Sequence, residues 1–214
     1  MKYALLFILS FLISLQQSNA QKKYVMVVGV ADYKNNNMDL RYSDDDAYRF
    51  YAYMKSTKGG SVPDENIVIL VDEAATRKNI LQTMNKVFAK AGRNDMLIFY
   101  FSGHGTKGAF CPYETSNDFN SLLSYDDIKK VFKKYPAKYK IVVGDACHSG
   151  SIYEGAPKGM LPISDSTNIV LIMSSKYSEV SEENQKIRQG AFSFYFRHFC
   201  WLKTRNFSYL NNFF

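Results

Sequence analysis

Cys147 and His104 are the residues of this sequence whose types and surroundings could carry out covalent chemistry. The segment Lys140–Gly150 reads KIVVGDACHSG, in which a short apolar run is followed by an acid, a cysteine and a histidine. The segment Met96–Gly105 repeats this design, because the apolar run MLIFYF leads into Ser-Gly-His-Gly. Open α/β sheets place their sites at the carboxyl ends of strands, so the two segments predict a catalytic pair.

The chemistry expected of such a pair is nucleophilic attack on a carbonyl carbon. A cysteine attacks as the thiolate, and a neighbouring imidazole can remove its proton or stabilise the anion. Side chains that end adjacent parallel strands can meet, because such strands lie about 5 Å apart. The glycines beside His104 leave a backbone N–H accessible, and the N–H of Cys147 would complete an oxyanion hole, in which each donor contributes about 10²–10³ in rate.

The rest of the chain supplies alternating strands and helices that can position these residues. Apolar runs predict strands, and apolar residues at helical spacing predict three helices, of which two are capped by Ser43 and Thr76 and one starts at Ser124. This order favours right-handed βαβ units and a mainly parallel sheet. Residues 105–123 are expected to form a long irregular loop. The predicted strands cover residues 24–30, 66–71, 96–101, 141–143 and 168–173.

Composition is consistent with one folded domain and limits the range of partners. The chain has 214 residues, of which 46% are hydrophobic and 22% charged, so it can bury a core. Its net charge of +7 comes from scattered lysines and arginines, which favours a solvated surface over a nucleic-acid site. Three cysteines, Cys111, Cys147 and Cys200, are too few and odd in number for a disulfide framework.

The first twenty residues have the pattern of a secretory signal. Lys2 precedes an apolar run from Ala4 to Leu15, and Ser18-Asn19-Ala20 places small residues before the expected cleavage site. We therefore expect a signal peptide at 1–20, a mature domain at 21–214, and a secreted or periplasmic protein. An uncleaved anchor is the alternative, but the run is shorter than the ~20 residues that span a bilayer. Near Phe214 the chain has no clear final element, so its C-terminal end is atypical.

These motifs together resemble the caspase-like cysteine peptidases of the metacaspase and bacterial orthocaspase branch. The resemblance runs from Tyr24 to about Tyr195 and rests on VVGVADY with a later DDDA, FYFSGHG, IVVGDACHSG and the GAFS of residues 190–193. It implies an α/β fold, a three-layer sandwich with a mainly parallel central sheet and helices on both faces. It also implies that Cys147 is the nucleophile, His104 the base or proton donor, and Gly105 with Cys147 the backbone oxyanion donors.

The resemblance further implies a substrate class. Asp145 corresponds to the acid at the base of the metacaspase specificity pocket, where caspases that prefer aspartate carry Gln. A buried carboxylate needs a cationic partner, so cleavage after Arg or Lys is expected in protein or peptide substrates. Ser174 and Ser175 are implied to be further substrate-binding residues. Arg41 lies near the loop from which caspases supply a pocket arginine, and it either neutralises Asp145 or faces solvent.

Two regulatory features are implied by position in the family. Self-cleavage is expected after Lys158, although an ordinary loop lysine is the alternative. A peripheral calcium site is expected at Asp126, Asp127 and Glu154, with Asp118 as a fourth candidate, because hard carboxylate oxygens suit calcium. Asp126 and Asp127 would equally suit the first turn of a helix. Calcium would act as an activator, since the chemistry itself requires no cofactor.

Other interpretations remain open. Cys147 could be an inert core residue, or it could bind zinc with His104, Cys111 and His148, although none of these pairs has a favoured zinc-ligand spacing. The whole domain could be an inactive scaffold that keeps the pair but lacks a substrate cleft. A hydrolase or transferase of another acyl substrate would use the same two residues.

Overall fold

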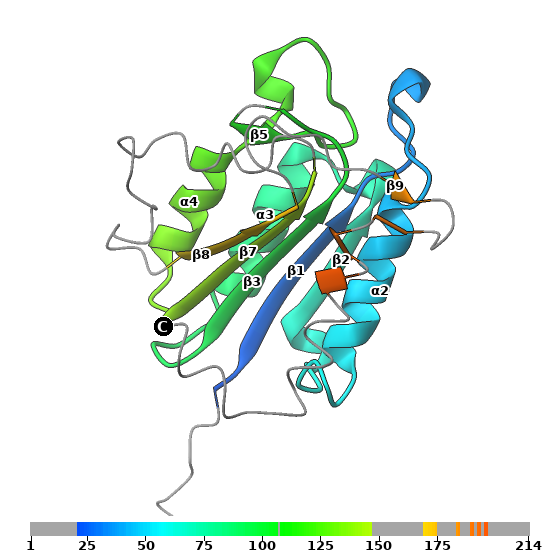
Figure 1. Ribbon diagram of the computed structural model, residues 1–214. Helices are drawn as coiled ribbons and strands as arrows, with labels where there is room; N and C mark the ends of the chain where they lie inside the picture. Colours follow the sequence, from blue (N-terminus) through cyan, green and yellow to red (C-terminus); the bar gives the residue numbers. More distant parts are fainter. Residues whose placement is uncertain are drawn as a thin grey trace, which may run out of the picture.

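The protein is built around a five-stranded sheet in which all neighbouring strands run parallel (Figure 1). The computed structural model describes residues 21–106, 108–146, 169–174, 183–184, 189–190, 192–193 and 195–196. The sheet order is β2 (Ile67–Val71), β1 (Lys23–Gly29), β3 (Met96–Ser102), β7 (Tyr139–Asp145) and β8 (Ile169–Met173). The two strands that lead into the reactive motifs, β3 and β7, are therefore neighbours, as the sequence predicts.

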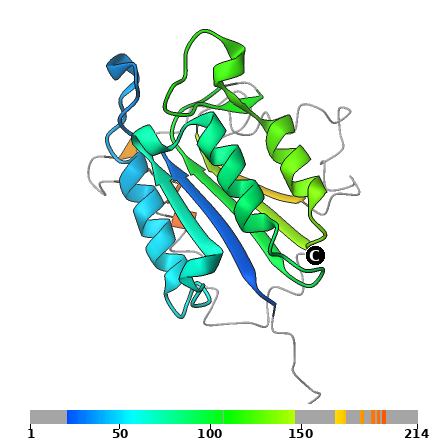
Figure 2. The same cartoon turned by 180° about the vertical axis from the view of Figure 1, so that it is seen from behind.

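Helices cover both faces of this sheet (Figures 1 and 2). Helix α2 (Ser43–Lys55) packs on one face, while α3 (Arg77–Phe88) and α4 (Tyr125–Lys134) pack on the other. Alternate residues of β1 point to opposite sides, so Val25 and Val27 join the α2 core and Met26 and Val28 join the α3–α4 core. The predicted three-layer α/β sandwich is confirmed.

Of the two predicted helix caps, Thr76 is confirmed and Ser43 is not, and the helix predicted from Ser124 has Ser124 as its N-cap. Thr76 accepts a hydrogen bond from Asn79 N–H at 3.2 Å, and Ser124 accepts one from Asp127 N–H at 3.1 Å. The prediction for Ser43 is wrong, because α2 already begins at Ser43 and its N-cap is Tyr42. Ser43 is buried where α2 approaches β1, and a Cβ added at Gly29 would lie 2.7 Å from the Ser43 carbonyl oxygen.

The segment between β3 and α4 is more ordered than the sequence predicts. It forms a small antiparallel sheet of β4 (Gly105–Thr106), β5 (Ala109–Phe110) and β6 (Leu123–Ser124). Phe110 is fully buried, with its ring stacked on Phe101 at 4.4 Å between centroids. Strands of two residues are too short to show a periodicity in the sequence, which is why the pattern predicts an irregular loop. In the structure, the buried Phe110 holds this segment against the core.

Short elements complete the described chain. They are η1 (Asn36–Met38), η2 (Asp64–Asn66), η3 (Asp72–Ala74), η4 (Phe119–Ser121), β9 (Glu183–Asn184) and β10 (Gln189–Gly190). Strands β9 and β10 pair antiparallel beside α2. Within the part of the chain that the structure describes, no helix is both long and apolar enough to cross a bilayer.

Candidate active site

The register of β3 and β7 brings the two reactive motifs to the same level of the sheet. Ser102 pairs with Asp145, and the N–H of Gly103 donates to the Asp145 carbonyl at 3.2 Å. His104 lies two residues after Ser102 in the chain, and Cys147 lies two residues after Asp145. Cys147 itself is outside the described residues, so its pairing with His104 stays a prediction.

His104 is held by its ring and by its backbone. Ring atom Nε2 lies 2.8 Å from the Met38 carbonyl oxygen, and the backbone N–H donates to the Tyr33 hydroxyl at 2.7 Å. A carbonyl oxygen only accepts, so Nε2 carries a proton and Nδ1 is the nitrogen that can exchange one. Gly103 precedes His104 with φ of 154°, and a Cβ there would lie 2.8 Å from the Tyr33 hydroxyl. Glycine is therefore required for this turn.

The β4–β5 pairing leaves the N–H of Gly105 outside its ladder. Gly105 pairs with Phe110, and the flanking hydrogen bond runs from Cys111 N–H to the His104 carbonyl at 3.0 Å. In an antiparallel ladder this pattern makes Gly105–Phe110 a non-hydrogen-bonded pair. The Gly105 N–H is not used by Phe110, which is what an oxyanion donor at this position requires.

Ser174 fixes the backbone immediately before Cys147. Its hydroxyl oxygen accepts from Ala146 N–H at 3.0 Å and lies 3.3 Å from the Ala146 carbonyl, to which it can donate. Its own N–H donates to the Gly144 carbonyl at 2.9 Å and so extends the β7–β8 pairing. The predicted substrate-binding residue Ser174 thus contacts the chain that leads to Cys147, whereas Ser175 lies outside the described residues.

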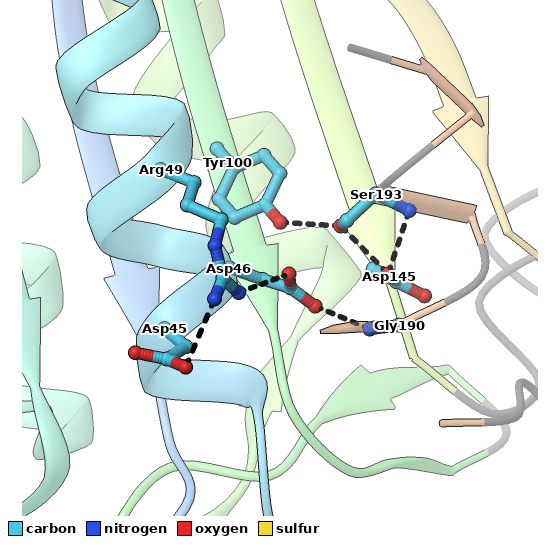
Figure 3. A network of polar contacts seen from close by, with 7 residues as sticks. All are labelled: Asp45, Asp46, Arg49, Tyr100, Asp145, Gly190 and Ser193. Atoms are coloured by element: carbon cyan, nitrogen blue, oxygen red, sulfur yellow. Dashed lines mark hydrogen bonds and ion pairs between the residues drawn. The ribbon is translucent and has the colours of Figure 1, made fainter. Parts of the chain in front are cut away.

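Asp145 is a buried carboxylate with a defined set of donors (Figure 3). Its Oδ2 accepts from the Ser193 hydroxyl at 2.7 Å and from the Ser193 N–H at 3.1 Å. The Tyr100 hydroxyl lies 2.6 Å from the Ser193 hydroxyl, so Tyr100 can donate to Ser193 while Ser193 donates to Asp145. Burial raises the pKa of Tyr100 well above its usual range, as do the nearby charges of Asp145 and Asp46, which keeps the phenol protonated as a donor.

Asp46 is a second buried carboxylate that the sequence interpretation did not place in the site. It comes from the first turn of α2, and its Oδ2 accepts from the Gly190 N–H at 2.7 Å (Figure 3). A Cβ added at Gly190 would lie 2.6 Å from Asp145 Oδ2 and 2.9 Å from Asp46 Oδ2. Gly190 therefore sits between the two carboxylates, and only glycine fits there. The DDDA motif was the available signal, but acids at a helix start are common for electrostatic reasons.

The remaining predicted residues are distributed differently. Arg41 is exposed in the turn before α2 and remains untested as a pocket residue. Lys158, the predicted self-cleavage position, and Glu154, a predicted calcium ligand, lie outside the described residues. Asp118 accepts the N–H of Asn120 at 2.9 Å and caps η4.

The predicted calcium ligands of α4 have protein partners. Asp127 Oδ2 lies 2.8 Å from Arg77 Nη2, and Asp126 is 80% exposed at 4.0 Å from Lys129. Burial alone would raise the pKa of Asp127, but hydrogen bonds from Ser124 and Arg77 hold it below its usual value. Among the described residues, no three His, Cys, Asp or Glu side chains form a group that could hold a metal ion.

Comparison with known proteins gives matches over most of the chain. Residues 22–207 match the family described as the caspase domain of peptidase family C14. Metacaspase-4 of Arabidopsis thaliana is 28% identical over 152 residues, covering 63% of this chain and 35% of that protein. Metacaspase-7 of the same plant is 26% identical over 178 residues, covering 75% of this chain and 42% of that protein. The chain thus spans well under half the length of these relatives.

A solved structure supports the fold independently of close sequence similarity. The crystal structure of a protein from Geobacter sulfurreducens superposes with a TM-score of 0.61 at 18% sequence identity. The match covers 81% of this chain and 79% of that chain. At this identity the likeness concerns the arrangement of strands and helices alone.

Proposed function

Because the chain belongs to the caspase-domain family of peptidases, we propose that it is a secreted cysteine endopeptidase that cleaves peptide bonds after Arg or Lys. The observation that carries the proposal is the Ser102–Asp145 pairing of β3 and β7. It gives the His104 and Cys147 motifs equivalent positions after adjacent strands. Two side chains that must exchange a proton need such proximity.

The proposed reaction proceeds through a thioester. The Cys147 thiolate attacks the scissile carbonyl carbon, and the resulting oxyanion accepts hydrogen bonds from the N–H groups of Gly105 and Cys147. His104 donates a proton from Nδ1 to the leaving amine, and the C–N bond breaks to leave an acyl-enzyme. His104 then removes a proton from water, which attacks the thioester and releases the carboxylate product and the thiol.

The preference for basic residues rests on the two buried carboxylates. Asp145 and Asp46 both lie next to Gly190, and Asp46 also pairs with Arg49 at 3.5 Å; two buried carboxylates so close together favour a further positive charge beside them. A substrate Arg or Lys would supply that charge, and Ser174 and Ser175 would bind the neighbouring substrate backbone. Arg41 is proposed to lie at the rim of this pocket.

Secretion, processing and calcium activation complete the proposal. Export would follow removal of residues 1–20, and self-cleavage would follow Lys158. Calcium is proposed to bind at Asp126, Asp127 and Glu154. Binding there would have to compete with Arg77, whose guanidinium already contacts Asp127 at 2.8 Å.

The test is hydrolysis of paired fluorogenic peptides that end in Arg, Lys or Asp, using residues 21–214 and its Cys147→Ala variant, with and without calcium. Cleavage after Arg or Lys that is absent from the variant would support the proposal. Cleavage after Asp would support a peptidase whose specificity pocket depends on Arg41 and not on Asp145. A folded protein that cleaves nothing would favour the inactive scaffold.

Self-cleavage after Lys158 can be measured in the same samples. Active protein incubated for a long period should yield a fragment that ends at Lys158, and Cys147→Ala protein should not. A chain that stays intact while it hydrolyses peptides would count against self-cleavage at this position.

A further inference from the structure

Asp72, at the end of β2, holds the turn that follows β1. Its Oδ1 accepts from two successive N–H groups, those of Ala31 at 2.9 Å and Asp32 at 3.0 Å. Asp72 has a φ of 45°, a left-handed conformation that costs a non-glycine residue on the order of 1 kcal/mol. The backbone of Asp72 is thus strained in the conformation in which its carboxylate binds two backbone donors beside the site.

The segment held by Asp72 contains two of the groups that contact His104. Tyr33 is 3% exposed, and its N–H donates to Asp39 Oδ1 at 2.9 Å. The carbonyl of Met38, five residues later, is the one that lies 2.8 Å from His104 Nε2. The segment closes on itself through the Leu40 N–H, which donates to the Ala31 carbonyl at 2.8 Å. Fixing its start at Ala31 therefore restricts where Met38 and Tyr33 can lie.

The Tyr33 hydroxyl links three segments at one point. It accepts from His104 N–H at 2.7 Å and donates to the Cys111 carbonyl at 3.3 Å. The Tyr33 and His104 rings also lie 5.2 Å apart between centroids. Because Cys111 N–H donates back to the His104 carbonyl, the backbone of His104 is fixed on both sides of its Cα.

We propose that Asp72 and Tyr33 are positioning residues for His104, acting as one hydrogen-bonded brace from the end of β2 through the 31–40 segment. The proposal rests on the proposed peptidase function and identifies which residues hold its proton donor. The brace fixes both the backbone and Nε2 of His104, which leaves Nδ1 as the ring nitrogen available for proton exchange. Its loss would displace the imidazole while leaving Asp145 and Asp46 to bind substrate.

Three variants test the brace against a matched control. Tyr33→Phe removes the hydroxyl, and Asp72→Ala removes the acceptor and places alanine at positive φ. Asp72→Asn keeps one oxygen acceptor and tolerates that conformation. The control is Tyr135→Phe, because Tyr135 is 9% exposed and its hydroxyl bonds to the Asn85 carbonyl at 3.0 Å, away from His104.

Steady-state kinetics on a peptide ending in Arg should separate positioning from binding. We expect kcat to fall about 10-fold to 100-fold in Tyr33→Phe and Asp72→Ala, with KM within about twofold, because small displacements of a reacting group are costly. Asp72→Asn should retain activity within about threefold, and Tyr135→Phe should match the parent chain. Tyr33→Phe that matches Tyr135→Phe would overturn the proposal.

A second readout does not need peptidase activity. The rate at which iodoacetamide alkylates Cys147, followed by peptide mass spectrometry as a function of pH, reports how His104 stabilises the thiolate. Tyr33→Phe and Asp72→Ala should shift the midpoint of this profile upward, and Tyr135→Phe should not. A parent chain that cleaves no peptide but shows this shift would support the brace and contradict the proposed function. Identical profiles would overturn the brace.

One further variant tests the role of Asp72 even if Asp72→Ala does not fold. Asp72→Gly removes the acceptor and relieves the left-handed strain, so it isolates the hydrogen bonds to Ala31 and Asp32. It should show the same upward shift in the alkylation profile, with a smaller loss of stability than Asp72→Ala. An unshifted profile in folded Asp72→Gly protein would reject Asp72 as part of the brace.

Discussion

The first turns of α2 and α4 have similar sequences and different roles. Each helix starts on the carboxyl side of the sheet with a serine and acids, Asp44–Asp46 in α2 and Asp126–Asp127 in α4. In α4, Asp127 is neutralised by Arg77 at 2.8 Å. In α2, Asp46 is buried and bonds to the backbone N–H of Gly190, next to Asp145. One first turn stabilises the fold, and the other adds negative charge to the candidate site.

The difference comes from the partners that the fold brings to each turn. Arg77 begins α3, whose neighbour on the same face is α4, so an ion pair forms between two helix starts. Asp46 instead meets a segment 144 residues later in the chain, where it accepts the backbone N–H of Gly190. Arg49, one turn along α2, lies 3.5 Å from Asp46 Oδ1. Loss of a carboxylate charge should therefore lower stability in the first turn of α4, at Asp127, and raise it in the first turn of α2, at Asp44.

The largest effect is expected from Asp46→Asn. If Asp46 shares the charge of a substrate Arg with Asp145, kcat/KM for peptides ending in Arg or Lys should fall about 100-fold, because a buried charge pair loses one member. Most of the loss should be in KM. The matched control is Asp45→Asn, since Asp45 is 49% exposed and pairs with Arg49 at the surface. Equal losses of kcat/KM in both variants would show that the total negative charge at the start of α2 determines activity, and not the buried carboxylate of Asp46.

An intermediate effect, on stability alone, is expected from Asp127→Asn. Loss of the partner of Arg77 should lower the free energy of unfolding by about 1–2 kcal/mol at pH 7, with kcat/KM measured in the absence of calcium unchanged. Burial opposes ionisation of Asp127, but Ser124 and Arg77 lower its pKa below 3.8, so this contribution is present above that pH. It should be lost as pH falls through the lowered pKa, which urea unfolding at a series of pH values would detect.

The Asp126→Asn variant distinguishes an ion pair between Asp127 and Arg77 from a calcium site. Asp126 is 80% exposed, so its substitution should leave stability unchanged if Asp127 serves Arg77. If both residues bind calcium, each substitution should abolish any rise in the unfolding midpoint that calcium produces in the parent chain. A calcium-dependent rise that only Asp127→Asn removes would contradict the predicted ligand set.

The sequence predicted the elements better than it predicted their partners. Buried strands such as Met96–Ser102 are continuous apolar runs, and caps such as Thr76 act within three residues, so both are local signals. The position of His104 at a strand end follows from the same signals. The contacts of Asp46 with Gly190 and of His104 with Tyr33 join residues 144 and 71 positions apart. Such pairs depend on strand order and register, which no local pattern specifies.

The smallest effect is expected from Asp44→Asn and should have the opposite sign to Asp127→Asn. Burial raises the pKa of Asp44 above 3.8, as do the charges of Asp72 and Asp45, while backbone hydrogen bonds only partly offset this. The folded state therefore disfavours the ionised form, and the penalty grows as pH rises through the raised pKa and vanishes below 3.8. Removing the charge should raise the thermal midpoint by about 1–2 °C at pH 7.

Thermal unfolding of Asp44→Asn and the parent chain, at pH 7 and at successively lower pH, would measure this gain. The two midpoints should converge at low pH, where the parent carboxyl is protonated. A lower midpoint for Asp44→Asn at pH 7 would mean that attraction to the start of α2 outweighs repulsion from Asp72. In that case the two first turns would differ only at Asp46, and the excess negative charge beside the candidate site would be confined to the Asp46–Asp145 pair.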